Sequence, residues 1–522
     1  MKLADLARCL EDARLEGDPD VEVKELAYDS REVGPGCLFV CIEGFSTDGH
    51  LFAPSALARG AAALVCERDI PGTEGVPRIR VPNTRRALAL LSAEMTGRPA
   101  DHLLTVGITG TNGKTTTAFL TEAVLRARGN RPGLLGTIQA QVGGQVRRLA
   151  NTTPESLDLH RLFAEMRQAR QDSVVMEVSS HALALDRVYG IPYDVGVFTN
   201  LSQDHLDFHG DMESYFQAKL RLFHSLGTVR GRPVTPYAVV NIDDEYGRRV
   251  LEVLRVPFVT YGFSEEAHVR ATEVDVGPDG LGYLLITPLG QSRVDLQLSG
   301  LFNVYNSLAA ISVGLALRVD LEPAVRAVES VEAVPGRFQL VSEGQDFAVV
   351  VDYAHTPAGL ASLLRSVREI TPGRVVAVYG CGGDRDRSKR PQMGRIGGEL
   401  ADFVVLTSDN PRSEDPMAIL AQVEGGLKAS GCPYAIQPDR EVAISLALHS
   451  ARPGDTVVIA GKGHETYQIF KDRTIPFDDV EVARRILRER PFPEQGKSQR
   501  RMPVRWNERR RVLPGLLRGS RR

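Results

Sequence analysis

Apolar residues occur along this chain in short continuous runs, most of which end in glycine, aspartate or histidine before a helical pattern begins. The middle of the chain contains LLTVGIT (103–109), SVVMEVSS (173–180), VGVFTNLS (195–202) and YAVVNIDD (237–244). A later block contains AVVVDYAHTP (348–357), VVAVYGCGGD (375–384), FVVLTSDNPR (403–412) and DTVVIAGKGHE (455–465). Apolar strands that alternate with helices indicate parallel sheets. The pattern therefore predicts an α/β protein with such a sheet in each block.

The first part of the chain has shorter elements and forms a block of its own. Its expected strands are CLFVCI (37–42), AAALVCE (61–67) and RIRV (78–81), and its helical pattern is LFAPSALARGA (51–61). The stretch MTGRPADHLL (95–104) then has the composition of a linker. We therefore predict domains at 1–99, 100–331 and 332–490, followed by a tail at 491–522. A chain of 522 residues is too long for one core, which agrees with several domains.

Composition places the chain among ordinary globular proteins, with 43% hydrophobic and 25% charged residues. The first residues lack the continuous apolar segment of an export signal, and no apolar run approaches the length of a membrane span. Six cysteines form no CxxC pair and no zinc-ligand spacing, so we expect reduced thiols. These features predict a cytoplasmic protein that does not contact a membrane.

The net charge of −3 conceals a strong asymmetry between the body and the tail. Residues 491–522 contain ten basic and two acidic side chains, whereas the rest of the chain has 53 basic and 64 acidic ones. We expect the tail to be a disordered extension; contact with nucleic acid or anionic lipid is the alternative. A body charge near −11 argues against nucleic-acid binding by the body itself.

The strongest local signal is GITGTNGKTTT (107–117), a strand followed by a glycine-rich turn and a helix start. Such a turn presents backbone N–H groups and a helix dipole to phosphate. Lys114 would neutralise the β- and γ-phosphates of ATP, and the Thr115 hydroxyl would hold Mg²⁺. The common phosphate-loop spacing is not satisfied, because Ile108 stands where its first glycine would be. A glycine-rich turn that binds no ligand is the alternative. The candidate ATP-binding residues are Gly110, Thr111, Asn112, Gly113, Lys114, Thr115 and Thr116.

Further candidates follow other strands. Glu177 and His205 lie just past apolar runs and offer an oxygen and an imidazole to a cation, although an ordinary loop histidine is the commoner case. Asp352 ends a strand where a carboxylate can bond ribose hydroxyls; a helix N-terminal turn is the alternative. Spacing alone gives Lys219 no role beyond a solvated helix position. These parts indicate an enzyme that uses ATP, Mg²⁺ and an anionic second substrate.

Ten motifs in order carry a resemblance to a known family. They are GTNGKTTT, MEVSSHAL, TNLSQDHLDFHG, YFQAK, LFNVYNSLAA, PGRFQ, DYAHTP, GCGGDRD, DNPR and GKGHE. Together they resemble the Mur ligases of peptidoglycan synthesis over roughly residues 20–480. The resemblance implies an N-terminal domain that binds a UDP-sugar, a central ATPase domain with a phosphate loop and parallel sheet, and a C-terminal Rossmann-like domain that binds the amino acid.

The resemblance also assigns roles to individual residues. It implies that Lys219 is carbamylated and binds Mg²⁺ with Thr115, Glu177 and His205, that Lys114, Lys219 and His205 are catalytic, and that ATP also contacts Asn303, Arg337 and Asp352. The implied UDP-MurNAc-dipeptide ligands are Tyr28, Ser30, Phe45, Ser46, Thr47, Asn151, Thr152, Thr153, Ser179 and Arg187. The implied diaminopimelate ligands are Arg385, Asp409, Asn410, Pro411, Arg412, Gly461 and Glu465.

The implied reaction is ATP-dependent addition of meso-2,6-diaminopimelate to the D-glutamate γ-carboxylate of UDP-MurNAc-L-Ala-D-Glu. Within the family, the DNPR motif occurs in the ligases that use diaminopimelate. A guanidinium such as that of Arg412 can bind the second carboxylate of diaminopimelate bidentately. The same reaction with L-lysine or L-ornithine, a ligase similar to folylpolyglutamate synthetase, and a non-catalytic ATP-binding regulatory module are the alternatives. We expect a monomer.

Overall fold

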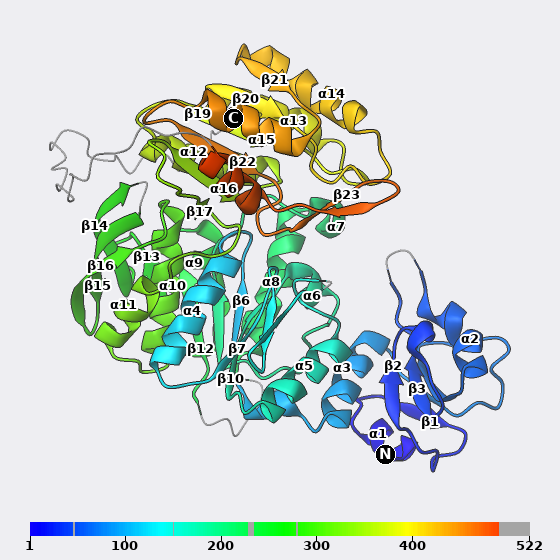
Figure 1. Cartoon of the computed structure of the whole chain (residues 1–522). Helices are drawn as coiled ribbons and strands as arrows, with labels where there is room; N and C mark the ends of the chain where they lie inside the picture. The colour runs from blue at the N-terminus through cyan, green and yellow to red at the C-terminus, as the bar shows by residue number, and fades with distance from the viewer. Residues whose placement is uncertain (45–46, 150, 228–233, 278–279, 490–522) are drawn as a thin grey trace.

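The computed structural model describes residues 1–44, 47–149, 151–227, 234–277 and 280–489. Three main sheets follow one another along the chain, with strands inside 14–80, 104–296 and 339–460. In Figure 1 the first sheet (blue) lies beside the central one (cyan to green), and the third (yellow to orange) lies above it. The predicted α/β class with three domains is confirmed, whereas the domain boundaries stay predictions. Phe45, Ser46 and the tail 491–522 lie outside the described residues.

The N-terminal sheet has five strands in the order β1-β5-β4-β3-β2. All neighbouring strands are parallel except β1 and β5. Apolar side chains of helices α1, α2 and α3 cover it, which explains why its inner strands β3 and β4 are continuously apolar. The bounds are β1 (Arg14–Glu16), β2 (Glu25–Ala27), β3 (Cys37–Val40), β4 (Ala61–Cys66), β5 (Arg78–Arg80), α1 (Leu3–Arg8), α2 (Ala53–Ala58) and α3 (Thr84–Met95).

The central sheet has eleven strands in the order β16-β15-β14-β13-β12-β11-β6-β10-β7-β8-β9. The run from β14 to β7 is parallel, as predicted, but the strands at both ends pair antiparallel, because hairpins join them. The bounds are β6 (Leu104–Thr109), β7 (Pro132–Leu135), β8 (Ala140–Val142), β9 (Gln145–Arg147), β10 (Ser173–Glu177), β11 (Val195–Phe198), β12 (Tyr237–Asn241), β13 (Phe258–Gly262), β14 (Val269–Gly277), β15 (Gly280–Thr287) and β16 (Gly290–Leu296).

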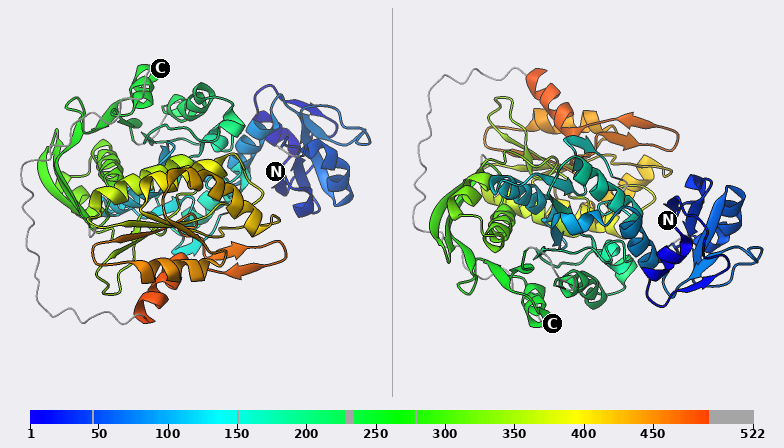
Figure 2. Two further views of the ribbon diagram at one scale, coloured as in Figure 1. Left: turned by 90° about the horizontal axis from the view of Figure 1, so that it is seen from above. Right: turned by 90° about the horizontal axis from the view of Figure 1, so that it is seen from below.

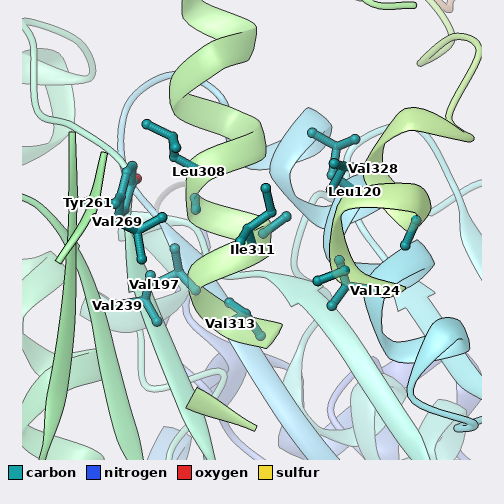
Figure 3. Close-up of a cluster of buried hydrophobic side chains, with 14 of the residues drawn as sticks. Leu120, Val124, Val197, Val239, Tyr261, Val269, Leu308, Ile311, Val313 and Val328 are labelled. Carbon is teal, nitrogen blue, oxygen red and sulfur yellow. The ribbon is translucent and has the colours of Figure 1, made fainter. Parts of the chain in front are cut away.

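Helices bury both faces of the central sheet. One face packs on α4 (Lys114–Ala127), α10 (Phe302–Ala316) and α11 (Leu321–Glu329), and Figure 3 shows Leu120, Leu308 and Ile311 in that layer. The other face packs on α5 (Ser156–Gln168), α8 (Met212–Ser225) and α9 (Glu245–Val253). Short helices α6 (Ser180–Ala184) and α7 (Leu206–His209) follow β10 and β11. Burial on both faces explains why the parallel strands are continuously apolar.

The C-terminal sheet has six strands in the order β17-β18-β22-β19-β20-β21, and all but the β17–β18 pair are parallel. Its strands are β17 (Gln339–Leu340), β18 (Ala348–Asp352), β19 (Val375–Tyr379), β20 (Phe403–Leu406), β21 (Tyr434–Ile436) and β22 (Thr456–Ala460). Its helices are α12 (Pro357–Ile370), α13 (Lys389–Leu400), α14 (Pro416–Leu427), α15 (Arg440–Ser450) and α16 (Asp479–Glu489). A hairpin of β23 (Tyr467–Ile469) and β24 (Thr474–Pro476) extends beside it, as Figure 2 shows.

Polar contacts join the three regions. Tyr28 donates a 2.7 Å hydrogen bond to Asp158 of α5, and Arg86 of α3 pairs with Asp186 at 3.3 Å. Arg148, just after β9, donates to the Thr466 hydroxyl of the C-terminal region at 2.5 Å. Among the described segments we find no helix with the length and apolar composition needed to cross a lipid bilayer.

Candidate active site

Two glycines shape the loop between β6 and α4. Gly110 (φ 145°) and Gly113 (φ 83°) adopt backbone angles that glycine tolerates best. A Cβ at Gly110 would stand 1.9 Å from the Thr199 hydroxyl oxygen, and one at Gly113 would stand 2.4 Å from Asn306 Oδ1. Both positions therefore exclude side chains, and the loop lies directly against α10 and the end of β11.

The segment that follows β11 holds the phosphate loop in place. The backbone N–H of Thr111 donates to the Asn200 carbonyl at 2.8 Å, and that of Asn112 donates to Asn200 Oδ1 at 2.9 Å. The Thr199 hydroxyl donates to the Asn112 carbonyl at 2.7 Å. Sequence reasoning assigned no role to Thr199 and Asn200, although the TNLSQDH motif contains them. The loop is thus preorganised by a neighbouring strand end.

Two lysine amines meet at one backbone oxygen of this loop. Lys114 Nζ donates to the carbonyls of Gly110 (2.9 Å) and Thr111 (2.8 Å), and Lys219 Nζ donates to the Gly110 carbonyl at 2.9 Å. Lys219 is 1% exposed, and its amine lies 4.5 Å from the centre of the Tyr215 ring. Burial lowers the pKa of both lysines, and Lys114 lowers the pKa of Lys219 further. The solvated position first expected for Lys219 from spacing alone is therefore wrong.

The proposed metal ligands surround the same loop but do not form a closed acidic cluster. Both carboxylate oxygens of buried Glu177 accept from Thr137, from its N–H at 2.8 Å and from its hydroxyl at 3.0 Å. Thr115 is buried at the start of α4, whereas the His205 side chain is 47% exposed and lies 3.4 Å from Asp204. Within the described residues, no group of three or more histidine, cysteine or acidic side chains could hold a metal ion. The four proposed metal ligands would include a second carboxylate only if Lys219 carried a carbamate.

Aromatic rings line the side of the site next to His205. His181 stacks on Phe208 at 4.3 Å and contacts the His205 ring edge-to-face at 4.8 Å between centroids. His209 Nε2 lies 2.9 Å from the Ser180 hydroxyl oxygen. Burial lowers the pKa of His181 and of His209 to about 4, so both imidazoles are neutral near pH 7. The His209 ring lies 4.9 Å from the Tyr215 ring, which the Lys219 amine faces, so a neutral imidazole stands on this side of the lysine pair.

The predicted dipeptide-binding residues of the central region lie on two segments, one before α5 and one after β10, and we call them the dipeptide arm. The Thr153 hydroxyl donates to the Glu177 carbonyl at 2.9 Å and accepts from the Ser179 N–H at 3.1 Å. Arg187 donates to the Thr153 carbonyl at 3.1 Å and pairs with Glu155 at 2.8 Å. The Thr152 hydroxyl lies 3.1 Å from that of Thr137, and Asn151 is exposed.

The other residues predicted to bind this substrate belong to the N-terminal region. Tyr28 follows β2, Ser30 begins a short 3₁₀ helix, and Thr47 accepts a backbone hydrogen bond from Gly44 at 2.9 Å. Arg85 of the same region lies 3.3 Å from Glu155, the carboxylate that also holds Arg187. This shared carboxylate links the N-terminal region to the dipeptide arm.

Residues predicted to bind the nucleoside of ATP have different surroundings. Buried Asn303 donates to the Ser299 carbonyl at 2.7 Å and accepts from Asn306, whose own carbonyl oxygen accepts from Thr117 of α4. This side chain therefore supports the phosphate-loop helix. Both oxygens of Asp352 accept backbone hydrogen bonds at 2.7 and 2.8 Å, and burial raises its pKa.

Arg337 lies between the central and C-terminal regions. Its guanidinium covers the Tyr353 ring at 4.8 Å. Its charge lowers the pKa of Lys114, so it belongs to the same electrostatic site. Among the described residues, its buried Nε atom has no hydrogen-bond partner. The position suits a phosphate oxygen, which would accept that hydrogen bond.

The loop after β20 carries the DNPR motif. Arg412 has a left-handed backbone (φ 53°), and its N–H donates to the Ile469 carbonyl at 3.0 Å. Its guanidinium donates to the Gly383 carbonyl at 2.8 Å. A Cβ on Gly382 would stand 2.9 Å from Arg412 Nη1 and 3.8 Å from Arg385 Cγ, so both arginines flank this glycine. A side chain at position 382 would collide with the Arg412 guanidinium.

The remaining diaminopimelate candidates meet around a lysine that sequence reasoning did not single out. Asn410 Nδ2 donates to Glu465 Oε2 at 2.8 Å, and Lys462 Nζ donates to the same oxygen at 3.0 Å. Gly461 (φ 117°) faces Asp409, because a Cβ there would be 3.3 Å from Asp409 Oδ2. Lys462 belongs to GKGHE, so its position in that motif was the available signal.

Three family descriptions match successive parts of the chain. They are "Mur ligase family, catalytic domain" at residues 22–96, "Mur ligase middle domain" at 108–314 and "Mur ligase, glutamate ligase domain" at 336–463. The matches fall on the N-terminal, central and C-terminal sheets in turn.

Curated relatives match nearly the whole chain. UDP-N-acetylmuramoyl-L-alanyl-D-glutamate–2,6-diaminopimelate ligase of Syntrophomonas wolfei is 47% identical and covers 94% of this chain and 99% of its own. The enzyme with the same description from Solibacter usitatus is 49% identical over 90% of this chain and 94% of its own. A solved structure of a ligase with that name is 32% identical, with a TM-score of 0.65, over 94% of this chain and 99% of its own. Folylpolyglutamate synthase of Mycobacterium tuberculosis, 20% identical with a TM-score of 0.60 over 73% of this chain and 92% of its own, shares the fold.

Proposed function

The chain belongs to the Mur ligase family, and from that premise we propose that it joins meso-2,6-diaminopimelate to UDP-MurNAc-L-Ala-D-Glu at the expense of ATP. The observation that carries this proposal is the 47% identity to a ligase of that name, which extends over 94% of the chain. The new amide forms at the γ-carboxylate of D-glutamate. The protein is thus an acid–amino-acid ligase of peptidoglycan precursor synthesis.

The reaction has two steps. The γ-carboxylate attacks the γ-phosphorus of ATP and forms an acyl phosphate while ADP leaves. The amine of diaminopimelate then attacks the acyl carbon, phosphate leaves, and the nitrogen loses a proton. Negative charge gathers on phosphoryl oxygens in the first step, and the Lys114 amine and the loop N–H groups stabilise it there.

Thr115, Glu177 and His205 would hold Mg²⁺ together with a carbamate on Lys219. The fit rests on the donor set, since carboxylate and hydroxyl oxygens are ligands that this ion prefers. When bound, Mg²⁺ would neutralise the charge of the ATP phosphates. Thr137 fixes the Glu177 carboxylate through two hydrogen bonds and so preorients it.

The surroundings of Lys219 support its proposed carbamylation. A lysine amine reacts with CO₂ only in its neutral form, and burial together with the neighbouring Lys114 lowers the pKa of Lys219 well below its usual range. The resulting carbamate would be an anion beside Lys114, so the attraction between the two groups replaces the repulsion between two ammonium ions. Lys219 then serves as an oxygen ligand instead of a buried cation.

The two substrates occupy different arms of the site. The arm of Asn151, Thr152, Thr153, Ser179 and Arg187, with Tyr28, Ser30 and Thr47, would hold the UDP-MurNAc-dipeptide. The seven residues from Arg385 to Glu465 would hold diaminopimelate, with Arg412 and Arg385 at its distal carboxylate and Glu465 at its ammonium group. Asn303 would act on ATP indirectly, through the phosphate-loop helix, instead of touching adenine.

Product formation with a panel of amino acids tests the proposed function. ADP release should require UDP-MurNAc-L-Ala-D-Glu, Mg²⁺ and diaminopimelate together, and mass spectrometry should show the joined product. Release with lysine or ornithine in place of diaminopimelate would correct the substrate. Release with a folate would favour the folylpolyglutamate alternative, and no release with any acceptor would favour a regulatory ATP-binding protein. A cytoplasmic, monomeric protein remains our prediction.

A further inference from the structure

Lys462 is a buried cation among the residues that would hold diaminopimelate. It follows Gly461 after β22, and its side chain is 0% exposed. Its amine lies 3.0 Å from Glu465 Oε2, 3.3 Å from Asn410 Oδ1 and 3.9 Å from Asp409 Oδ1. Burial of an ammonium group is unfavourable unless such oxygens surround it. The lysine is therefore held by the pocket itself.

The same contacts fix the orientation of Glu465. Its Oε2 atom accepts from both Lys462 and Asn410. Within the described part of the chain, no hydrogen-bond donor is paired with the other oxygen, Oε1. The carboxylate thus has one oxygen tied to the protein and one that can accept from a substrate ammonium group. Without the lysine, the side chain would keep only the amide of Asn410 to hold it.

Lys462 also sets the charge of this part of the pocket. Asp409 and Glu465 together carry two negative charges, and the lysine reduces the sum to one. Asp409 is 7% exposed, and its Oδ1 atom has no hydrogen-bond partner among the described residues, so the nearby amine compensates a carboxylate that would otherwise be buried alone. A net charge of −1 matches a single ammonium group.

We propose that Lys462 is a positioning and specificity residue for the amino-acid substrate, acting through Glu465 and Asn410. It presents Glu465 Oε1 to the distal ammonium group of diaminopimelate. It also keeps the charge of this subsite at −1. A charge of −2 would favour the substrate L-lysine, because the distal end of that amino acid has an ammonium group and no carboxylate. The inference rests on the proposed function, because it names a determinant of the same site.

Steady-state kinetics of Lys462→Met test this role. The KM for diaminopimelate should rise by roughly 30-fold or more, which corresponds to loss of one partner of a buried charge pair. The KM for ATP and the KM for UDP-MurNAc-L-Ala-D-Glu should stay within about threefold of wild type, since the hydrogen bonds of Lys462 go to Asn410 and Glu465, which are assigned to neither substrate. The ratio of lysine use to diaminopimelate use should increase. Exposed Lys471 on the neighbouring hairpin gives the matched control, Lys471→Met, which should change none of these values.

A double variant separates positioning from general disruption. If Lys462 acts through Glu465, then Lys462→Met combined with Glu465→Gln should lose much less than the product of the two single losses. The inference would be overturned if the loss in the double variant equalled the product of the two single losses. It would also be overturned if all three KM values rose equally or if the KM for diaminopimelate did not change. If Lys462→Met does not fold, Lys462→Gln keeps a donor of similar length but loses the charge. It should raise the KM for diaminopimelate by less than Lys462→Met would, leave the other two KM values unchanged, and still increase the ratio of lysine use to diaminopimelate use. A wild-type enzyme that ignores diaminopimelate would instead refute the proposed function, and the inference with it.

Discussion

Lys114 and Lys219 donate hydrogen bonds to the same carbonyl oxygen, that of Gly110, each at 2.9 Å. Burial lowers the pKa of both amines, and the neighbouring charge of Lys114 lowers the pKa of Lys219 further, because two ammonium groups this close repel each other. A lowered pKa favours the neutral form of the Lys219 amine, which is the form that the carbamate of our proposal requires.

Carbamylation of Lys219 should make activity depend on CO₂. We expect turnover to fall when the enzyme is kept in CO₂-free buffer and to return on addition of bicarbonate. Protein equilibrated with ¹³C-bicarbonate should show a carbamate carbon resonance that Lys219→Ala lacks. Lys219→Ala should be severely impaired and partly restored by short carboxylates. Full activity of Lys219→Ala would refute the carbamate role.

Lys114→Ala should reduce ADP release by roughly 100-fold or more, because its charge meets negative charge that develops during phosphoryl transfer. The fold should persist, since both hydrogen bonds that the Lys114 amine makes among the described residues go to carbonyls of its own loop. Circular dichroism and the melting temperature check the fold, and exposed Lys471→Ala serves as the control. ADP release within tenfold of wild type would contradict the assignment.

Arg412→Ala should raise the KM for diaminopimelate far more than that for ATP. Loss of a charge-assisted pair costs about 2–5 kcal/mol, which corresponds to roughly 30-fold to several thousand-fold. The variant should also lose most of its preference for diaminopimelate over lysine. Arg395→Ala is the control, because Arg395 is exposed on α13 and its ion pair is with Glu399 of the same helix. If Arg412→Ala kept its preference for diaminopimelate over lysine, another residue would have to bind the distal carboxylate.

His160 should make folding stability depend on pH. Burial lowers the pKa of this imidazole to about 4, against about 6.5 in the unfolded chain. Between pH 4 and pH 6.5 the unfolded state therefore binds a proton that the folded state does not. The free energy of unfolding is not reduced by this protonation above pH 6.5, and it decreases as the pH falls toward 4. A shift of this size corresponds to about 3 kcal/mol.

Denaturant titrations of wild type and His160→Gln between pH 4 and pH 7 measure this term. The wild-type free energy of unfolding should decline more steeply with falling pH than that of His160→Gln. His224→Gln, at an exposed position, should keep the wild-type slope. Parallel slopes for wild type and His160→Gln would show that the imidazole is not held neutral by burial.

Local sequence patterns were sufficient to predict most of the buried parallel strands of the central and C-terminal sheets. Alternation of apolar strands with helices is a local property, and it correctly indicated β6, β10, β11, β12, β18, β19, β20 and β22. It did not indicate β21. The predicted phosphate loop is likewise a local pattern, because its glycines and Lys114 lie within a few residues of one another. Local patterns of this kind follow from side-chain periodicity and turn chemistry, which need no knowledge of distant segments.

Contacts between side chains that are far apart in the sequence could be found only in the folded structure. Lys219 is 109 residues from Gly110 in sequence, and Lys462 is 52 residues from Asn410, so no spacing rule could join them. The antiparallel ends of the central sheet likewise depend on which edge accepts each hairpin. Burial was the deciding physical factor, since it turned two lysines that look like ordinary solvated residues into groups whose charge must be neutralised, paired or chemically changed.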